Sequence, residues 1–340
     1  MCLGQLLMRS FCSVLLPVLI SIAGAMGILA FPVTSLARTA SSGLQQEGYQ
    51  KDESGDQGGG SKPPASDRVT ESTRDAAAAT PAKGEEGTEK TVQIGDGNTT
   101  PFKVGRIVFP TYDFKMANKR LFYGLYLPQD FDESKTYPLV VVLHGLGGSP
   151  GQILAYPGLT KYADREGYIL VAPMGYNARG WYGSRGKGGG RGSDPRNLGE
   201  LSEQDVLEVL KLTRRNFQID PDRIYLFGHS MGGGGSMHLA MTYPKIWAAM
   251  AVIAPAAYGS RDRLAKAKDI PAYVVQGDQD RLVSVRQTRL WVDKMKELGM
   301  KHEYIEVKNG GHVFLAWQHF DGIFSFFAGN TKSKQPTLPK

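Results

Sequence analysis

Hydrophobic residues recur through residues 97–330 in short runs typical of strands, separated by longer stretches with helical spacing. Runs rich in β-branched and aromatic residues predict strands at 102–109, 121–127, 139–143, 168–172, 223–227, 248–253, 272–276 and 302–307. Helical spacing predicts helices at 200–217, 231–243, 286–298 and 314–327. The first two strands follow each other directly, and strands and helices then alternate. This order predicts an α/β fold with a mostly parallel, doubly wound sheet and antiparallel N-terminal strands.

The N-terminal 37 residues have the pattern of a secretory signal. Residues 11–31 are nearly all apolar and follow Arg9, and Ser35-Leu36-Ala37 places small residues at the two positions that a signal peptidase reads. We expect a signal peptide over 1–37 and a secreted or periplasmic protein. An uncleaved anchor in the membrane is the alternative, because about 20 apolar residues can span a bilayer.

Residues 38–96 are rich in Gly, Ser, Pro, Ala, Glu and Lys, so they cannot bury enough apolar surface to offset the entropy of ordering. We expect a disordered linker there, a folded α/β domain over 97–330 and a flexible tail over 331–340. Of the chain's 40 Lys and Arg and 33 Asp and Glu, 32 and 22 lie in 97–340. This basic balance fits either an anionic substrate or a role in solubility.

The two cysteines, Cys2 and Cys12, both precede the predicted domain, which excludes a disulfide framework, a zinc ribbon and a cysteine nucleophile there. No H-x-H or H-E-x-x-H pattern appears, and the glycines around Lys187 lack the Ser or Thr and the strand–helix frame of a phosphate-binding loop. We therefore expect neither a metal nor a cofactor. The sequence also lacks an arginine-rich helix or an aromatic pattern that would favour nucleic-acid binding.

The segment Gly228-His229-Ser230-Met231-Gly232 fits the pattern G-x-S-x-G and lies between a predicted strand and a predicted helix. That context is the one in which a sharp turn exposes a nucleophilic serine. The glycines allow the strand and the helix to approach closely around a strained backbone. We expect Ser230 to be the nucleophile.

A serine hydroxyl needs a base and a carboxylate that orients the base, and in this fold they follow the serine in the order acid, then His. His312 lies in a glycine-rich loop between the last predicted strand and the last predicted helix, where it can reach Ser230. The loop after strand 272–276 offers two carboxylates. The arrangement G-x-x-D-x-x-V selects Asp280, and Asp278 is the alternative.

An oxyanion hole needs two backbone N–H donors near the nucleophile. One is expected from Met231, the residue after the serine, and the other from Leu146 in the H-G-L-G-G segment after strand 139–143. His144 opens this segment, and we expect it to brace the loop through a hydrogen bond.

Residues 178–194 hold seven glycines, four basic residues and the pair Trp181-Tyr182, after the strand that ends near residue 172. Loops after strands in this fold face the active site, so the segment can form a lid that meets an anionic substrate. Trp181, Tyr182 and Arg179 are then candidate substrate contacts. A disordered loop with solvated charges is the alternative.

Several segments together resemble the α/β-hydrolase superfamily: 123–128, 137–148, the G-H-S-M-G-G stretch from 228, the G-x-x-D stretch from 277, and the G-G-H stretch ending at 312. Within it the chain is similar to a secreted esterase group of feruloyl esterases, acetylxylan esterases and polyhydroxybutyrate depolymerases, together with predicted peptidases of that type. Leu146 stands where many depolymerase-like members have a cysteine, which disfavours polymer depolymerisation.

These residues predict a secreted serine carboxylic-ester hydrolase that works through an acyl-enzyme. The alternatives are a serine peptidase of the prolyl-oligopeptidase type, a secreted acyltransferase, and a non-catalytic binding module on the same fold. Expected substrates are small-molecule, polysaccharide or polyester esters, anionic ones included. We expect no nucleic-acid partner, and a membrane only if the N-terminal segment stays uncleaved.

Overall fold

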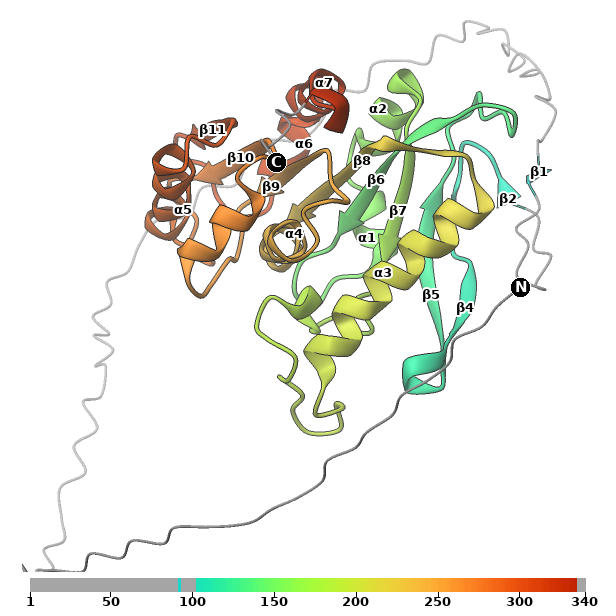
Figure 1. Ribbon diagram of the computed structural model, residues 1–340, viewed down its shortest axis with the longest axis horizontal. Coiled ribbons are helices and arrows are strands. Elements are labelled where there is room, and N and C mark those ends of the chain that lie inside the picture. Colours follow the sequence, from blue (N-terminus) through green and yellow to red (C-terminus); the bar gives the residue numbers. More distant parts are fainter. Residues whose placement is uncertain (1–90, 93–101, 335–340) are drawn as a thin grey trace, which may run out of the picture. The chain divides into compact units, whose positions relative to one another are not determined.

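The hydrophobic runs of the chain pair into one mixed sheet, as seen in a computed structural model that describes residues 91–92 and 102–334 (Figure 1). Within these residues the sheet has nine strands, in the order β11-β10-β9-β8-β6-β7-β5-β3, with β4 paired to β5. The strands are β3 (Ile107–Val108), β4 (Thr111–Phe114), β5 (Lys119–Tyr126), β6 (Tyr137–Leu143), β7 (Ile169–Pro173), β8 (Ile219–His229), β9 (Ala249–Ile253), β10 (Ala272–Gly277) and β11 (His302–Val307). A separate antiparallel pair joins β1 (Thr91–Val92) to β2 (Phe102–Lys103).

The strands from β6 to β11 run parallel, and β5 joins β7 in antiparallel pairing. All seven residues of β6 are buried, as expected of a parallel strand covered on both faces. The predicted α/β fold, mostly parallel with an antiparallel start, is therefore confirmed.

Helices cover both faces of the sheet. The helices are α1 (Pro150–Leu154), α2 (Leu159–Glu166), α3 (Leu198–Asn216), α4 (Met231–Thr242), α5 (Val285–Glu297), α6 (Leu315–Gln318) and α7 (Phe320–Gly329), with short 3-10 helices η1 (Lys115–Ala117), η2 (Trp181–Gly183), η3 (Arg261–Ala267) and η4 (Lys332–Lys334). Alternate residues of β6 pack into two separate clusters: Leu139 and Val141 with α3, α4 and α5, and Val140 and Val142 with α1, α2, α6 and α7. This two-sided packing is the doubly wound arrangement.

The structure differs from the predicted elements mainly where they are short. The run at 102–109 divides into β2 and β3, because the chain turns at Gly105, whose φ is 71°. Helix α1 was not predicted, since five residues are too few to show helical spacing, although Pro150 at its start and the Ser149 hydroxyl that caps it are typical start signals. The predicted helix 314–327 is two helices that meet at His319.

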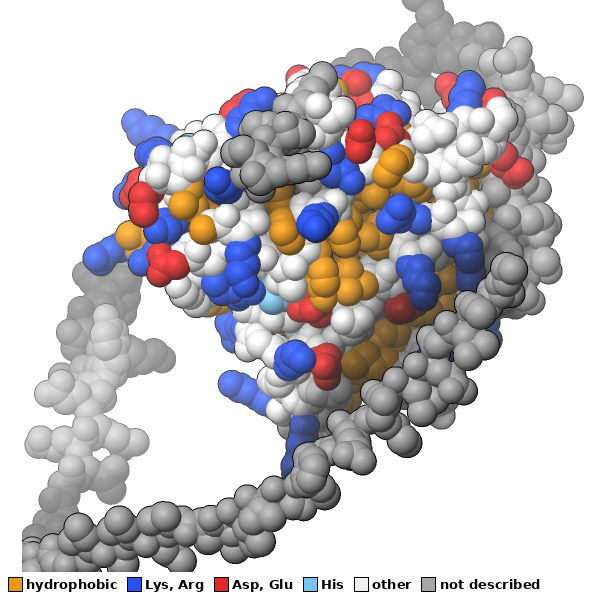
Figure 2. Space-filling view, viewed as in Figure 1, with side chains coloured by type: hydrophobic (Ala, Val, Ile, Leu, Met, Phe, Trp, Pro, Cys, Tyr) orange, Lys and Arg blue, Asp and Glu red, His pale blue; other side chains and the backbone are white. Residues whose placement is uncertain are grey.

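The predicted signal peptide at 1–37 lies outside the described residues, as do most of the predicted linker and residues 335–340 of the predicted tail. In the described part of the chain, the helices are all too short or too polar to cross a membrane. On the face shown in Figure 2, Lys and Arg side chains are spread among apolar and uncharged surface.

Candidate active site

Ser230 occupies a strained turn between β8 and α4. Its φ is 58° and its ψ is −118°, a backbone conformation that is costly for a residue with a side chain. Three hydrogen bonds hold it: its N–H donates to the Ile253 carbonyl at 2.9 Å, and its own carbonyl accepts from Ala256 at 2.9 Å and Gly234 at 3.1 Å. The turn is therefore fixed from β9 and from the first turn of α4.

Two glycines allow this turn because the chain passes very close to itself. A Cβ on Gly232 would lie 2.0 Å from the Leu143 carbonyl oxygen, and one on Gly228 would lie 2.2 Å from the Gly232 oxygen. Both distances are far below contact, so neither position admits a side chain. The close approach places the end of β6 directly beside Ser230.

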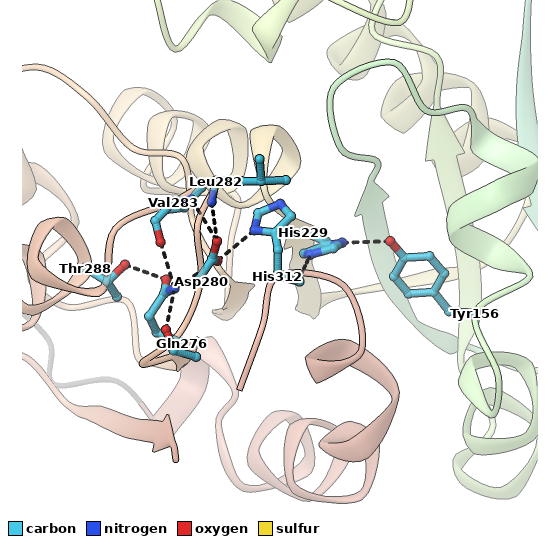
Figure 3. A network of polar contacts seen from close by, with 9 residues as sticks. Tyr156, His229, Gln276, Asp280, Leu282, Val283, Thr288 and His312 are labelled. Carbon is cyan, nitrogen blue, oxygen red and sulfur yellow. Dashed lines mark hydrogen bonds and ion pairs between the residues drawn. The ribbon is translucent and has the colours of Figure 1, made fainter. Parts of the chain in front are cut away.

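His312 and Asp280 form a pair near the ends of β10 and β11 (Figure 3). The His312 Nδ1 lies 2.7 Å from Asp280 Oδ2. The other Asp280 oxygen accepts the backbone N–H groups of Leu282 at 2.8 Å and Val283 at 2.9 Å. Burial alone would raise the pKa of Asp280, but the hydrogen bonds from Val283, His312 and Leu282 lower it below its ordinary value. Asp280 is therefore held as a carboxylate beside the imidazole.

A second layer orients this carboxylate. The buried Gln276 donates from Nε2 to Asp280 Oδ2 at 3.0 Å, and its Oε1 accepts from the Thr288 hydroxyl at 2.7 Å. The amide nitrogen of Gln276 must face Asp280 Oδ2 and the Val283 carbonyl oxygen at 3.1 Å, because both oxygens only accept, and this leaves Oε1 to accept from Thr288. Sequence reasoning missed both residues; a polar Gln at the end of the buried strand β10 was the available signal.

The alternative acid, Asp278, is not brought to His312. Its backbone N–H donates to the Val307 carbonyl at 3.1 Å, which joins its loop to the end of β11. Its Oδ1 is buried and has no hydrogen-bond partner among the described residues. Asp280, and not Asp278, is therefore the carboxylate that lies against His312.

Ser230, His229 and His312 line one cavity of about 600 Å³, together with the H-G-L-G-G segment. Gly145 of that segment is so close to the serine that a Cβ there would lie 4.0 Å from the Ser230 hydroxyl oxygen. His144 braces the segment as predicted, since its ring nitrogens lie 2.8 Å from the Gly145 oxygen and 3.0 Å from the Met174 oxygen.

The two residues expected to supply the oxyanion donors lie next to Ser230 and in the lining of its cavity. Met231 is the first residue of α4, and Leu146 lies in the cavity lining. Within the described residues, no protein acceptor takes the backbone N–H of either one. Such free donors beside a nucleophile suit a developing negative charge.

The three expected substrate contacts have different positions. Trp181 lines the cavity, as predicted. Tyr182 does not, because it is fully buried and its hydroxyl donates to the His144 carbonyl at 3.3 Å. Arg179 also lies outside this lining, and its guanidinium is paired with Asp194 at 2.7 Å. The expectation that Tyr182 and Arg179 face the cavity is therefore corrected, since long-range packing and an ion pair occupy both side chains.

A family model described as "Putative esterase" matches residues 115–322. The chain belongs to this esterase family. Rat S-formylglutathione hydrolase is 31% identical over 144 residues, which cover 39% of this chain and 51% of the rat enzyme. Feruloyl esterase B of Neurospora crassa is 30% identical over 131 residues, which cover 37% of this chain and 42% of the fungal enzyme. The chain thus spans about half the length, or less, of these curated relatives.

A solved ferulic acid esterase of Anaeromyces mucronatus, in complex with ferulic acid, has the same fold. It aligns with a TM-score of 0.55 at 19% identity, over 66% of this chain and 90% of that one. At this identity the likeness concerns the fold alone.

A second set of hydrogen bonds, which was not predicted from the sequence, joins both sides of the cavity (Figure 3). His229 Nε2 lies 2.9 Å from the His312 carbonyl oxygen, and its Nδ1 lies 2.7 Å from the Tyr156 hydroxyl. A carbonyl only accepts, so Nε2 carries the proton and Nδ1 accepts from Tyr156. Burial lowers the pKa of His229 to about 4, so the ring is neutral at physiological pH. His229 thereby ties the His312 loop to the α1–α2 connection.

This neutral histidine makes the stability of the protein depend on pH. The folded-state pKa of His229 is below its unfolded value of about 6.5, so its contribution is complete above that pH and is lost as pH falls toward 4. His229→Gln keeps a donor and an acceptor but does not titrate. Between pH 6.5 and 4, the free energy of unfolding should therefore fall by about 3 kcal/mol less in His229→Gln than in the wild type. Urea unfolding at each pH measures this, and parallel pH profiles for the two proteins would contradict the assignment.

Proposed function

We propose that this chain is a serine hydrolase that cleaves carboxylic esters through an acyl-enzyme on Ser230. The observation that carries the proposal is the 2.7 Å pair between His312 and Asp280, whose histidine lines the same cavity as a serine held in a strained turn. Nucleophile, base and orienting carboxylate are the minimum set for this chemistry. Membership of the esterase family supports the same reaction class.

In the first half of the reaction, the Ser230 oxygen attacks the ester carbonyl and His312 accepts the serine proton. The Asp280 contact occupies Nδ1, so the proton goes to Nε2. The carboxylate stabilises the imidazolium that forms. The backbone N–H groups of Leu146 and Met231 hold the oxyanion. When the carbon–oxygen bond to the alcohol breaks, His312 gives its proton to the leaving alkoxide, and the acyl group remains on Ser230.

In the second half, His312 removes a proton from water, and the water oxygen attacks the acyl carbonyl. The same two donors hold the second oxyanion. Collapse releases the acid, and His312 returns its proton to Ser230. No metal is needed at any step, and within the described residues no group of three His, Cys, Asp or Glu side chains is placed to hold one.

The substrate class follows from the relatives and the cavity lining together. The names of these relatives point to a feruloyl ester and to S-formylglutathione, a thioester whose acyl group is formyl. Trp181, Tyr156 and Tyr258 give this cavity aromatic walls. We propose small or aromatic acyl esters as substrates, on either a small-molecule or a polysaccharide carrier.

Secretion is part of the proposal and rests on the apolar segment 11–31 with the small residues Ser35 and Ala37. The layout of signal peptide over 1–37, linker over 38–96 and catalytic domain over 97–330 is retained on the same sequence grounds. An enzyme released from the cell would act on esters outside it.

The nucleophile and base can be tested together on p-nitrophenyl esters of graded chain length and on feruloyl and acetyl-sugar esters. Ser230→Ala and His312→Ala should each lower kcat by roughly 10⁵- to 10⁶-fold, and the double variant should lose little more, because the residues act as a unit. Circular dichroism of each variant checks that the fold is kept. Full turnover by Ser230→Ala would refute the serine mechanism.

The two aspartates of the β10 loop form a matched pair for testing the acid. Asp280→Asn should lower kcat by roughly 10³- to 10⁴-fold, because the amide no longer holds the imidazole in the required tautomer. Asp278→Asn should have a much smaller effect, since its side chain has no contact with His312. Initial rates on p-nitrophenyl acetate measure both. A larger loss of kcat in Asp278→Asn than in Asp280→Asn would show that Asp278, and not Asp280, is the acid.

A further inference from the structure

Arg185 is the charged side chain of the cavity. Within the described part of the chain, the lining residues of the Ser230 cavity include no Asp, Glu or Lys, and Arg185 is the one Arg. The cavity therefore contains one permanent positive charge among apolar, aromatic and backbone groups and uncharged polar side chains such as Gln152. A guanidinium without a carboxylate partner, in the same cavity as Ser230, is a candidate site for an anionic group of the substrate.

Two aromatic rings hold the Arg185 side chain. Its guanidinium carbon lies 3.4 Å from the centre of the Trp181 ring and 5.1 Å from that of Tyr258, and the two rings are 6.1 Å apart. A guanidinium stacked on a ring face keeps its N–H donors in its own plane, free for an acceptor. Among the described residues, Arg185 is not paired with any carboxylate. The stacking fixes the group without using its hydrogen bonds.

The neighbouring basic residues differ from Arg185 in this respect. Arg179 is paired with Asp194, at 2.7 Å between Nε and Oδ2, and Lys187 lies 3.6 Å from Glu200. Neither they nor Arg191 belong to the lining of the Ser230 cavity. Arg185 is therefore the one basic residue of the loop that lines the Ser230 cavity.

The loop that carries Arg185 is tied to α3 on both sides of that residue. The Tyr182 N–H donates to the buried Ser202 hydroxyl at 3.0 Å, and the Tyr176 N–H donates to the buried Asp205 at 2.9 Å. Further along, the Gly199 N–H donates to the Gly188 carbonyl at 2.8 Å. Arg185 thus lies between two anchored points, so little ordering is required when a ligand binds.

We propose that Arg185 selects esters that bear a carboxylate, which its guanidinium binds while Ser230 attacks the ester carbonyl. The inference rests on the proposed function and adds the substrate class. Guanidinium and carboxylate match in geometry and form paired N–H···O bonds. Four apolar or aromatic side chains of the lining, Leu146, Tyr258, Leu282 and Val313, are each about half exposed or more. The preferred substrate is therefore an apolar or aromatic ester with one carboxylate.

The test compares matched esters that differ in charge. In one arm the carboxylate is on the alcohol side, as 4-acetoxybenzoate against 4-acetoxybenzamide. In the other it is on the acyl side, as the mono-p-nitrophenyl ester of adipic acid against p-nitrophenyl hexanoate. In Arg185→Gln, the ratio of kcat/KM for the charged ester to that for the neutral ester should fall about fivefold in one arm, as expected for a partly exposed ion pair. The arm that responds tells which side of the ester Arg185 faces.

Lys187→Gln is the matched control, because it removes the same charge from the same loop outside the cavity. Its charged-to-neutral ratios should stay close to those of the wild type. Ratios unchanged by Arg185→Gln in both arms would overturn the proposal, and so would an equal fall in Lys187→Gln, since that would show a general electrostatic effect.

A binding measurement separates this inference from the proposed function. Calorimetry on Ser230→Ala should show tighter binding of 4-acetoxybenzoate, or of adipate as the acyl-side probe, than of the neutral analogue, and this preference should be lost in Ser230→Ala/Arg185→Gln. Wild-type hydrolysis without any carboxylate preference would leave the esterase proposal intact and refute the role of Arg185. If Ser230→Ala binds the carboxylate probes preferentially but the wild type hydrolyses none of the esters, the esterase proposal is refuted and the role of Arg185 in binding is not.

Discussion

The conformation of Ser230 is the constraint on which the site depends. A φ of 58° at this residue persists only because β9 and α4 hold its backbone, and because Gly228 and Gly232 let the chain pass within contact distance of Leu143. The adjacency of β6 and β8 in the sheet follows from the same packing. It places the H-G-L-G-G segment beside the hydroxyl, so one local strain positions both the proposed nucleophile and the proposed oxyanion donors.

The parallel sheet supplies the other groups from its far side. The carboxyl ends of β10 and β11 lead to Asp280 and His312, and parallel strands deliver such loops to one edge. The Asp280 carboxylate is kept charged by backbone donors, and Gln276 and Thr288 fix its surroundings. His229 then links this side to the β6 side through its bond to the His312 carbonyl. The cavity is therefore bounded by two halves that a neutral histidine joins.

Local patterns could predict much of this. The alternation of strands and helices predicted the fold class. Residue types at fixed offsets pointed to Ser230, Asp280 and His312, because these residues lie in short turns whose residue spacing restricts where each side chain can be. Features set by particular partner residues could not be predicted this way. Arg179 forms an ion pair with Asp194 in the same loop, and the Tyr182 hydroxyl bonds the His144 carbonyl. Helices as short as α1 leave too few residues for a periodic signal.

Trapping the covalent intermediate tests the central claim most directly. The protein would be mixed with a p-nitrophenyl ester, quenched in acid during turnover, digested and analysed by mass spectrometry. The account predicts one acyl group on the peptide that contains Ser230, and no adduct in Ser230→Ala under the same conditions. Release of p-nitrophenol by the wild type with the acyl group on another residue, or with the same adduct in Ser230→Ala, would contradict it.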